Sequence, residues 1–165
     1  MSLSGAKQHE ERGAPSREES RSSPDHFEDE DGSSFIALHG ATVLLVEDDT
    51  LNREALELVF AYYGAHVISV DSASAALEQY ERAAPAILVS DIVLPDGDGY
   101  ALLRTIRACD RDLDHRLPAI AISGSLGVDA NARAYAAGFD VFLAKPVNTS
   151  VLLLAMQQLM ERTGD

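Results

Sequence analysis

The sequence contains very little of several residue types on which particular structures depend. Cys109 is the only cysteine among the 165 residues, and there is no tryptophan. A single cysteine cannot form an intrachain disulfide, so we expect a reducing compartment, and we predict that Cys109 packs as a small buried hydrophobic residue. No apolar run approaches the roughly 20 residues that a membrane-spanning helix needs. The polar N-terminus, MSLSGAKQHEERG, also lacks a signal-peptide pattern. These absences indicate a cytoplasmic protein with no membrane contact.

Basic side chains are scarce as well. The chain has 13 Lys and Arg against 27 Asp and Glu, which gives a formal net charge of −14 at pH 7. Such an excess of negative charge repels polyanions, so nucleic acid and anionic membrane surfaces are excluded as direct partners. Only two of the basic residues are lysines, Lys7 near the N-terminus and Lys145 near the C-terminus.

Residues 1–38 contain almost no apolar side chains. Ser, Glu, Asp, Arg and Pro predominate, and the segment includes the acidic cluster FEDEDG. A segment of this composition cannot bury enough apolar surface to offset the entropy lost on folding. We therefore predict an acidic, disordered tail over residues 1–38 and one folded domain over residues 39–165. A solvated leader or a linker is favoured for the tail over a partner-binding segment.

After residue 40 the sequence alternates between two patterns. Short apolar runs of strand length, ATVLLV, AHVISV, PAILVS, PAIAIS and FDVFLA, are separated by helical stretches at 51–63, 74–83, 100–108, 130–137 and 151–162. Gly64 and Gly138 each stand where a helix should end in a left-handed residue. Five such units, with strands apolar along their length, predict an α/β fold. We expect a doubly wound, five-stranded parallel sheet, flavodoxin-like (βα)5, with strand order 2-1-3-4-5.

Polar residues stand where the predicted strands end. The first strand is followed by Glu47, Asp48 and Asp49, the third ends in Asp91, the fourth in Ser123-Gly124 and the fifth in Lys145-Pro146. Ligands of doubly wound sheets bind beyond the carboxyl ends of the strands, close to the point where the strand order reverses. These groups are therefore candidates for one shared site.

The chemistry of this set favours phosphate and Mg²⁺. Two carboxylates ~4 Å apart repel by about 4 kcal/mol at an effective dielectric constant near 20, and a bound cation relieves that repulsion. A small set of oxygen ligands suits Mg²⁺, which in proteins usually accompanies phosphate. Lys145, the only lysine of the predicted domain, can neutralise a phosphate oxygen or Asp91. An aspartate can also act as the nucleophile towards a phosphoryl group, and Asp91 is the candidate because it ends the central strand.

Four motifs carry a resemblance to a known family. VLLVEDD, SDIVLPDGDG, AIS and LAKP, in this order, resemble the receiver domain of two-component response regulators over about residues 41–163. The resemblance implies that Asp91 is the phosphoacceptor and that Glu47 and Asp48 bind Mg²⁺, Asp48 directly and Glu47 through water. It also implies that the backbone carbonyl of Val93 completes the metal site. Asp49 falls one place beyond the acid pair and is expected to cap a helix or turn.

The resemblance assigns further roles near the phosphoryl group. Its switch residues correspond to Ser123 and Phe142, Lys145 and Gly124 lie at the phosphoryl-binding position, and the bond before Pro146 is expected to be cis. Core packing explains the spacing of Phe142 equally well. Val93 is apolar where some receivers carry a polar side chain that positions the hydrolytic water, so we expect no help with autodephosphorylation from it.

The implied function is that of a signalling module. A histidine kinase or histidine phosphotransfer protein would donate the phosphoryl group, and a downstream protein would bind the face formed by helix 130–137, strand 139–144 and helix 151–162. The chain would act on no separate substrate, so it is not expected to be an enzyme. A monomer or a phosphorylation-dependent dimer fits this function. The module could be a single-domain regulator, a phosphorelay intermediate or a receiver from a hybrid histidine kinase.

The residues bear on three other functions. A flavin-binding protein would need a phosphate-binding Ser/Thr/Gly loop after the first strand, where this chain has the acidic VEDDTLN. A Mg²⁺-dependent phosphohydrolase would need a general acid and a cap segment, and no stretch is long enough for a cap. A receiver-like interaction module that takes up no phosphate remains as the main alternative.

Overall fold

The computed structural model describes residues 36–111, 115–124 and 127–164. Most of the predicted tail, residues 1–35, lies outside these ranges. Ile36 and Leu38, on the tail side of the boundary predicted at residue 39, belong to the packed part: Leu38 is 1% exposed and Ile36 packs against the same core cluster. Among the described helices, none combines the length and apolarity that crossing a bilayer requires.

The main sheet has five parallel strands in the order β2-β1-β3-β6-β7. The strands are β1 (Thr42–Val46), β2 (His66–Val70), β3 (Ile87–Asp91), β6 (Ala119–Ser123) and β7 (Val141–Ala144). The predicted fold class and the strand order 2-1-3-4-5 are confirmed. The three inner strands are almost entirely buried, whereas the edge strands β2 and β7 are only partly buried. Inner strands covered on both faces explain why their sequences are continuous apolar runs.

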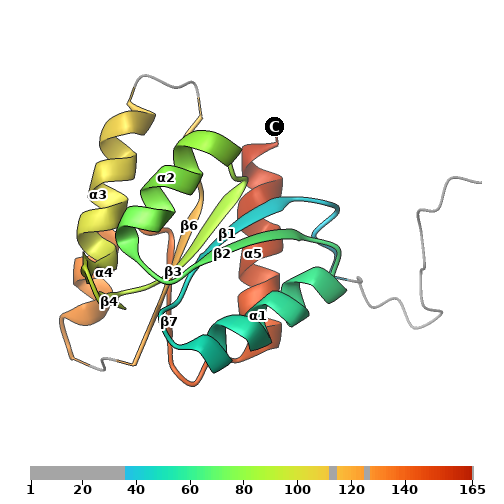
Figure 1. The fold of residues 1–165 in the computed structure, drawn as a ribbon, viewed down its shortest axis with the longest axis horizontal. Coiled ribbons are helices and arrows are strands. Elements are labelled where there is room, and N and C mark those ends of the chain that lie inside the picture. The colour runs from blue at the N-terminus through green and yellow to red at the C-terminus, as the bar shows by residue number, and fades with distance from the viewer. Residues whose placement is uncertain (1–35, 112–114, 125–126, 165) are drawn as a thin grey trace, which may run out of the picture. The chain divides into compact units, whose positions relative to one another are not determined.

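Helices cover both faces of the sheet (Figure 1). They are α1 (Thr50–Tyr62), α2 (Ala73–Ala83), α3 (Gly99–Asp110), α4 (Ala130–Ala137) and α5 (Thr149–Thr163). Side chains of α2, α3 and α4 pack with one set of strand residues, and side chains of α1 and α5 pack with the alternate set. The core therefore has two halves, one on each face, as period-two alternation along strands requires.

The ends of the helices follow the residues that sequence patterns favour there. The side chains of Asp49, Ser72, Asp98 and Asn148 each accept a hydrogen bond from a backbone N–H in the first turn of α1, α2, α3 and α5. The prediction that Asp49 caps a helix or turn is confirmed. Gly64 (φ +90°) and Gly138 (φ +109°) are left-handed, as predicted.

Two features differ from the sequence-based expectations. Cys109 is exposed, so the prediction that it is buried was wrong. Cys109 lies in the last turn of α3. There the helix borders a hollow, not a strand, and this hollow is lined also by Ala84, Pro85 and Leu117. The loop after β3 also contains an unpredicted antiparallel hairpin of two-residue strands, β4 (Val93–Leu94) and β5 (Gly97–Asp98).

A buried polar network joins α2, α3 and the segment before β6. The Asp110 carboxylate accepts hydrogen bonds from the Tyr80 hydroxyl (2.6 Å), the Arg107 guanidinium (2.9 Å) and the backbone N–H of Leu117 (3.2 Å). Arg107 also donates to the carbonyl oxygens of Leu117 and Gly138. Burial and the hydrogen bond to Asp110 raise the pKa of Tyr80 above its usual value. The network ties together three elements at the edge where β6 begins.

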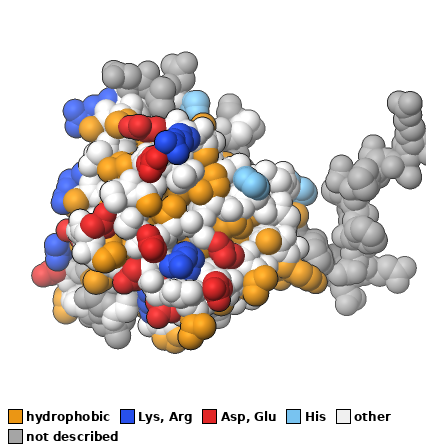
Figure 2. Space-filling view, in the orientation of Figure 1, with side chains coloured by type: hydrophobic (Ala, Val, Ile, Leu, Met, Phe, Trp, Pro, Cys, Tyr) orange, Lys and Arg blue, Asp and Glu red, His pale blue; other side chains and the backbone are white. Residues whose placement is uncertain are grey.

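The surface carries apolar side chains between many acidic ones (Figure 2). Along α1 the side chains of Leu51, Leu58 and Tyr62 are exposed, and Val151 and Leu154 are about half exposed on α5. Leu51, Leu58 and Tyr62 are spaced seven and four residues apart, which places them on one stripe of the helix. This stripe runs along the outer side of α1, away from its core residues Leu56 and Phe60.

Candidate functional site

The sheet brings the predicted site residues to its carboxyl edge. Glu47 directly follows β1, Asp91 is the last residue of β3, Ser123 is the last residue of β6 and Lys145 directly follows β7. The parallel register pairs Asp91 with Ile122 and Ser123 with Ala144, so these strands end at nearly the same level. Residues almost a hundred positions apart in the chain therefore meet at one place.

Three carboxylates form the acidic part of the site. One oxygen from each of Glu47, Asp48 and Asp91 lies within 4.8 Å of the others. Glu47 and Asp91 are buried, with Asp91 5% exposed, whereas Asp48 faces solvent. Burial raises the pKa of Glu47 in spite of its hydrogen bonds to Lys145 and to the Asp49 backbone. The arrangement concentrates negative charge at the carboxyl edge of the sheet, with Asp48 exposed to solvent.

Lys145 neutralises the two buried acids. Its Nζ donates to Asp91 Oδ2 at 2.5 Å and to Glu47 Oε2 at 2.8 Å. Burial lowers the pKa of Lys145, but the hydrogen bonds to Asp91 and Glu47 outweigh this effect and raise it. Lys145 is therefore a fixed positive charge beside the Asp91 carboxylate.

The backbone around Asp91 holds its carboxylate in place. Asp91 Oδ1 accepts a hydrogen bond from the backbone N–H of Val93 at 3.1 Å. The N–H of Gly99 donates to the carbonyl of Ile92 at 2.7 Å, and a Cβ at Gly99 would lie 2.5 Å from the Asp91 carbonyl oxygen. Only glycine permits this close approach between the start of α3 and the end of β3.

The remaining predicted residues lie in β6 and β7 or directly after these strands. Ser123 is buried, and its carbonyl accepts a hydrogen bond from the Lys145 backbone N–H at 2.8 Å. A Cβ at Gly124 would meet no atom within 4 Å, so there is open space beside its backbone. Phe142 is partly buried and packs against the core half that contains α2, α3 and α4. The Lys145–Pro146 peptide bond is cis.

Two side chains at the site were not anticipated from the sequence. Arg53, in the first turns of α1, donates from Nη1 to the carbonyl oxygen of Glu47 at 2.8 Å and so supports the acidic loop. Asp96, at the tip of the β4–β5 hairpin, accepts hydrogen bonds from the backbone of α2. No local pattern indicates either contact, because each joins segments whose approach depends on tertiary packing.

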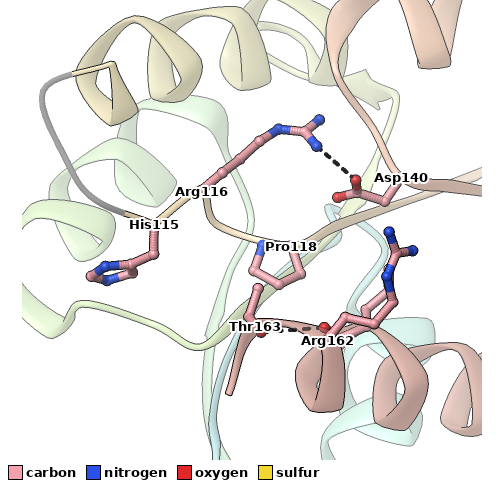
Figure 3. Close-up of a pocket in the computed structure, with 7 residues that line it drawn as sticks. His115, Arg116, Pro118, Asp140, Arg162 and Thr163 are labelled. Carbon is pink, nitrogen blue, oxygen red and sulfur yellow. Dashed lines mark hydrogen bonds and ion pairs between the residues drawn. The ribbon is translucent and has the colours of Figure 1, made fainter. Parts of the chain in front are cut away.

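The hollow shown in Figure 3 lies at the edge of the sheet opposite the acidic cluster, and it contains none of the predicted site residues. It has a volume of about 320 Å³ and is lined by His115, Arg116, Pro118, Asp140, Leu159, Arg162 and Thr163. Arg116 points to Asp140 and forms an ion pair with it at 2.9 Å. Pro118 and Asp140 precede β6 and β7, so this hollow lies at the amino ends of the strands, away from Asp91.

The acidic cluster is suited to Mg²⁺. Its side-chain ligands are all oxygens, they come from three residues, and one of them is open to solvent, which leaves room for the waters that Mg²⁺ retains. The described residues of the cluster include no sulfur or nitrogen ligand of the kind that zinc prefers. The donor set therefore fits the metal that the resemblance implies.

Comparison with known proteins agrees with this geometry. The family model described as the response regulator receiver domain matches residues 43–157. The chain belongs to the response regulator receiver domain family. A receiver domain is a signalling module of two-component systems, and the pocket formed by Glu47, Asp48 and Asp91 is consistent with its phosphoacceptor site.

Several relatives contain a similar receiver domain. The response regulator protein FleR of Pseudomonas aeruginosa is 38% identical over 113 residues, which are 68% of this chain and 23% of that protein. An uncharacterized 14.6 kDa protein of Leptolyngbya boryana is 34% identical over 116 residues, 70% of this chain and 87% of that protein. The non-phosphorylated HemR receiver domain of Leptospira biflexa is 27% identical, with a TM-score of 0.65 over 73% of this chain and 94% of that structure. The chain thus spans only a quarter of FleR but most of the other two.

Proposed function

We propose that this receiver domain accepts a phosphoryl group on Asp91 in a Mg²⁺-dependent reaction, from a histidine kinase or a histidine phosphotransfer protein. The observation that carries the proposal is the position of the Asp91 carboxylate. It is buried at the end of the central strand, 2.5 Å from Lys145 Nζ and beside two further acids that fit a divalent cation.

The reaction transfers the phosphoryl group from one nucleophile, the imidazole nitrogen of the donor, to another, the Asp91 carboxylate. One oxygen of the Asp91 carboxylate forms a bond to phosphorus, the bond from phosphorus to the donor's imidazole nitrogen breaks, and its electron pair returns to the ring. A carboxylate nucleophile carries no proton that a separate base would have to remove. The hydrogen bond from the Val93 N–H to Oδ1 fixes the carboxylate before the attack.

Charge neutralisation is the main demand of such a transfer. Bound Mg²⁺ would supply part of it, held by Asp48 and Asp91, by Glu47 through water, and by the Val93 carbonyl. Lys145 supplies the rest, since its Nζ can turn from the carboxylate to a phosphoryl oxygen. Ser123 and the open backbone beside Gly124 are the remaining candidates for contacts with that group.

Phosphorylation would then change the surface that a downstream protein binds. In our proposal Ser123 and Phe142 shift together, which biases the face of α4, β7 and α5. Phe142 is only partly buried, so its side chain borders both the core and the surface. Tyr135, Val151 and Leu154 are about half exposed on the two helices of this face, which offers a partner apolar contact area. We include three further points in this proposal. A downstream protein binds this face, the protein is cytoplasmic, and the domain begins near residue 36.

The test is the intact mass of the chain after incubation with acetyl phosphate. We expect a single phosphoryl adduct on the wild type with Mg²⁺, none with EDTA, and none on Asp91→Asn. Asp71→Asn is the matched control, because Asp71 is an exposed acid at the end of the edge strand β2. It should be modified like the wild type.

Two outcomes would contradict the proposal. An adduct that persists on Asp91→Asn would mean that another residue is modified. The absence of any adduct, from acetyl phosphate and from histidine-phosphorylated donor proteins alike, would favour an interaction module that functions without phosphate.

A further inference from the structure

The hairpin after β3 carries part of the candidate metal site but does not join the main sheet. Its two strands pair only with each other and form a sheet separate from the main one. The side chain of Val93 is 63% exposed and gains little from packing, whereas Leu94 is buried. Such a short hairpin is marginally stable by itself. The position of the Val93 carbonyl must therefore depend on contacts that the hairpin makes with other elements.

Asp96, at the tip of the hairpin, makes such a contact. Its Oδ1 accepts a hydrogen bond from the backbone N–H of Ala73 at 2.8 Å, and its Oδ2 accepts one from the N–H of Ser74 at 2.9 Å. These N–H groups belong to the first turn of α2, where the helix itself provides no acceptor. Leu94-Pro95-Asp96-Gly97 has the residue types of a tight turn, with Pro second and Gly fourth. The turn directs Asp96 away from the hairpin towards α2.

We propose that Asp96 is a positioning residue of the metal site, which ties the β4–β5 hairpin to α2 and thereby fixes the backbone carbonyl of Val93. The inference rests on the proposed function, because the carbonyl matters only if Mg²⁺ binds there. It goes beyond that function by assigning a role to a side chain that touches neither metal nor phosphate.

The geometry of Mg²⁺ explains why such a support is needed. The ion requires near-octahedral ligands at about 2.0–2.1 Å, so a ligand displaced by a few tenths of an ångström binds it poorly. Asp91 ends β3 of the main sheet and Asp48 lies in the short turn between β1 and α1, whereas Val93 lies in the separate hairpin. α2 is a firm anchor for the hairpin, since Ala76 is fully buried and Leu77 and Tyr80 pack against the core.

Ser72 provides a matched control for the capping effect. It caps the same helix end, with its Oγ accepting a hydrogen bond from the Ala75 N–H at 3.3 Å, but it belongs to the segment just before α2 and does not reach the hairpin. Loss of either side chain removes acceptors from the first turn of α2. Only the loss of Asp96 also removes the hydrogen bonds between the hairpin and α2.

The experiment measures Mg²⁺ affinity by isothermal titration calorimetry on the full chain, without any phosphodonor. Asp96→Ala and Ser72→Ala should both lower the urea midpoint of unfolding, because both remove a helix cap. Asp96→Ala should weaken Mg²⁺ binding by roughly tenfold, the lower end of the effect of outer-shell residues on metal affinity. Ser72→Ala should bind Mg²⁺ like the wild type.

Asp96→Asn separates the hydrogen bonds from the charge, and it serves as the second variant if Asp96→Ala does not fold. It removes the same negative charge but keeps one acceptor for α2. If tethering is the cause, its Mg²⁺ affinity lies between those of the wild type and Asp96→Ala. Equal losses in both Asp96 variants would mean that the charge alone attracts the cation, and the inference would be wrong.

The remaining outcomes separate this inference from the proposed function. If the wild type binds Mg²⁺ and Asp96→Ala binds it as tightly as Ser72→Ala does, the positioning role is overturned while the metal site stands. If the wild type binds no Mg²⁺, the proposed Mg²⁺-dependent function and the positioning role are both overturned.

Discussion

At the scale of single residues, Lys145 offsets charges that the sheet brings together. Its ammonium group contacts Asp91 and Glu47, both buried, and Asp48 lies beside them. Without a cation, an uncompensated buried charge would be left at the end of the central strand, and breaking a buried ion pair typically costs about 3–5 kcal/mol. The need for a positive charge beside these carboxylates explains why the only lysine of the described domain stands at this position.

Val93 gives a prediction about the lifetime of the phosphoryl group. Its exposed hydrocarbon side chain cannot orient a water molecule beside Asp91. Val93→Asn supplies a donor and an acceptor there, so we expect dephosphorylation to be at least about tenfold faster, which corresponds to about 1.4 kcal/mol in the barrier. The measurement is the decay of the adduct mass after the phosphodonor is removed. Val93→Ala, which adds no donor or acceptor, serves as the control, and an unchanged half-life in Val93→Asn would contradict the prediction.

Gly99 gives a prediction about stability and the site together. Alanine is normally favoured over glycine in a helix by about 1 kcal/mol, but here its Cβ would lie 2.5 Å from the Asp91 carbonyl oxygen. We expect Gly99→Ala to lower the free energy of unfolding in urea by about 1–3 kcal/mol, because backbone must shift, and to weaken Mg²⁺ binding.

Gly127→Ala is the control for Gly99→Ala. A Cβ at Gly127 would meet no atom within 4 Å. This variant should unfold within about 0.5 kcal/mol of the wild type. A Gly99→Ala chain as stable as this control would show that the start of α3 can move away from β3 without cost.

At the scale of helices and strands, the network around Asp110 joins α2 and α3 at the edge opposite the site. Asp110→Ala would leave the Tyr80 hydroxyl, the Leu117 N–H and the Arg107 guanidinium without this partner. We expect the free energy of unfolding to fall by about 2–4 kcal/mol, because buried polar groups lose their hydrogen bonds. Urea unfolding followed by circular dichroism measures this change.

The exposed pair Glu78–Arg82 on α2 is the comparison for Asp110. Its atoms are as close, 2.7 Å apart, but both side chains are more than half exposed. Glu78→Ala should therefore change stability by no more than about 0.5 kcal/mol. Similar losses in the two variants would mean that burial does not determine the contribution of these ion pairs.

At the scale of the whole molecule, Mg²⁺ binding should stabilise the folded domain. The cation reduces repulsion among three carboxylates that come from two strand ends, and the unfolded chain does not hold them together. At a Mg²⁺ concentration 100 times the dissociation constant, the free energy of unfolding should rise by ~2.7 kcal/mol. Urea unfolding with Mg²⁺ and with EDTA measures the difference.

Asp48→Asn is the control for this metal effect. It should remove most of the Mg²⁺-dependent stabilisation and leave the metal-free domain at least as stable as the wild type, because one of the repelling charges is gone. An equal gain from Mg²⁺ in wild type and variant would place the stabilising ion elsewhere on this acidic chain.

The sequence by itself determined the strands of the main sheet, the helices between them, their order and the residues at the strand ends. Apolar runs of strand length, helical spacing, and capping residues such as Asp49 and Gly138 act over a few neighbouring residues, so the chain alone specifies them. The right-handed crossover rule then predicts the strand order, and parallel strands place Asp91 and Lys145 at one edge. These features were predictable because local chemistry and a small set of topologies suffice for them.

Only the tertiary structure decided the contacts between segments that sequence patterns do not relate. Cys109 is exposed because the end of α3 borders a hollow, although its spacing also suits a buried position. The contacts of Asp96 with α2 and of Asp110 with Tyr80 join residues 22 to 30 positions apart. Each depends on the exact distance and direction between two packed elements, which are set by the close packing of the whole core and not by any one stretch of the chain.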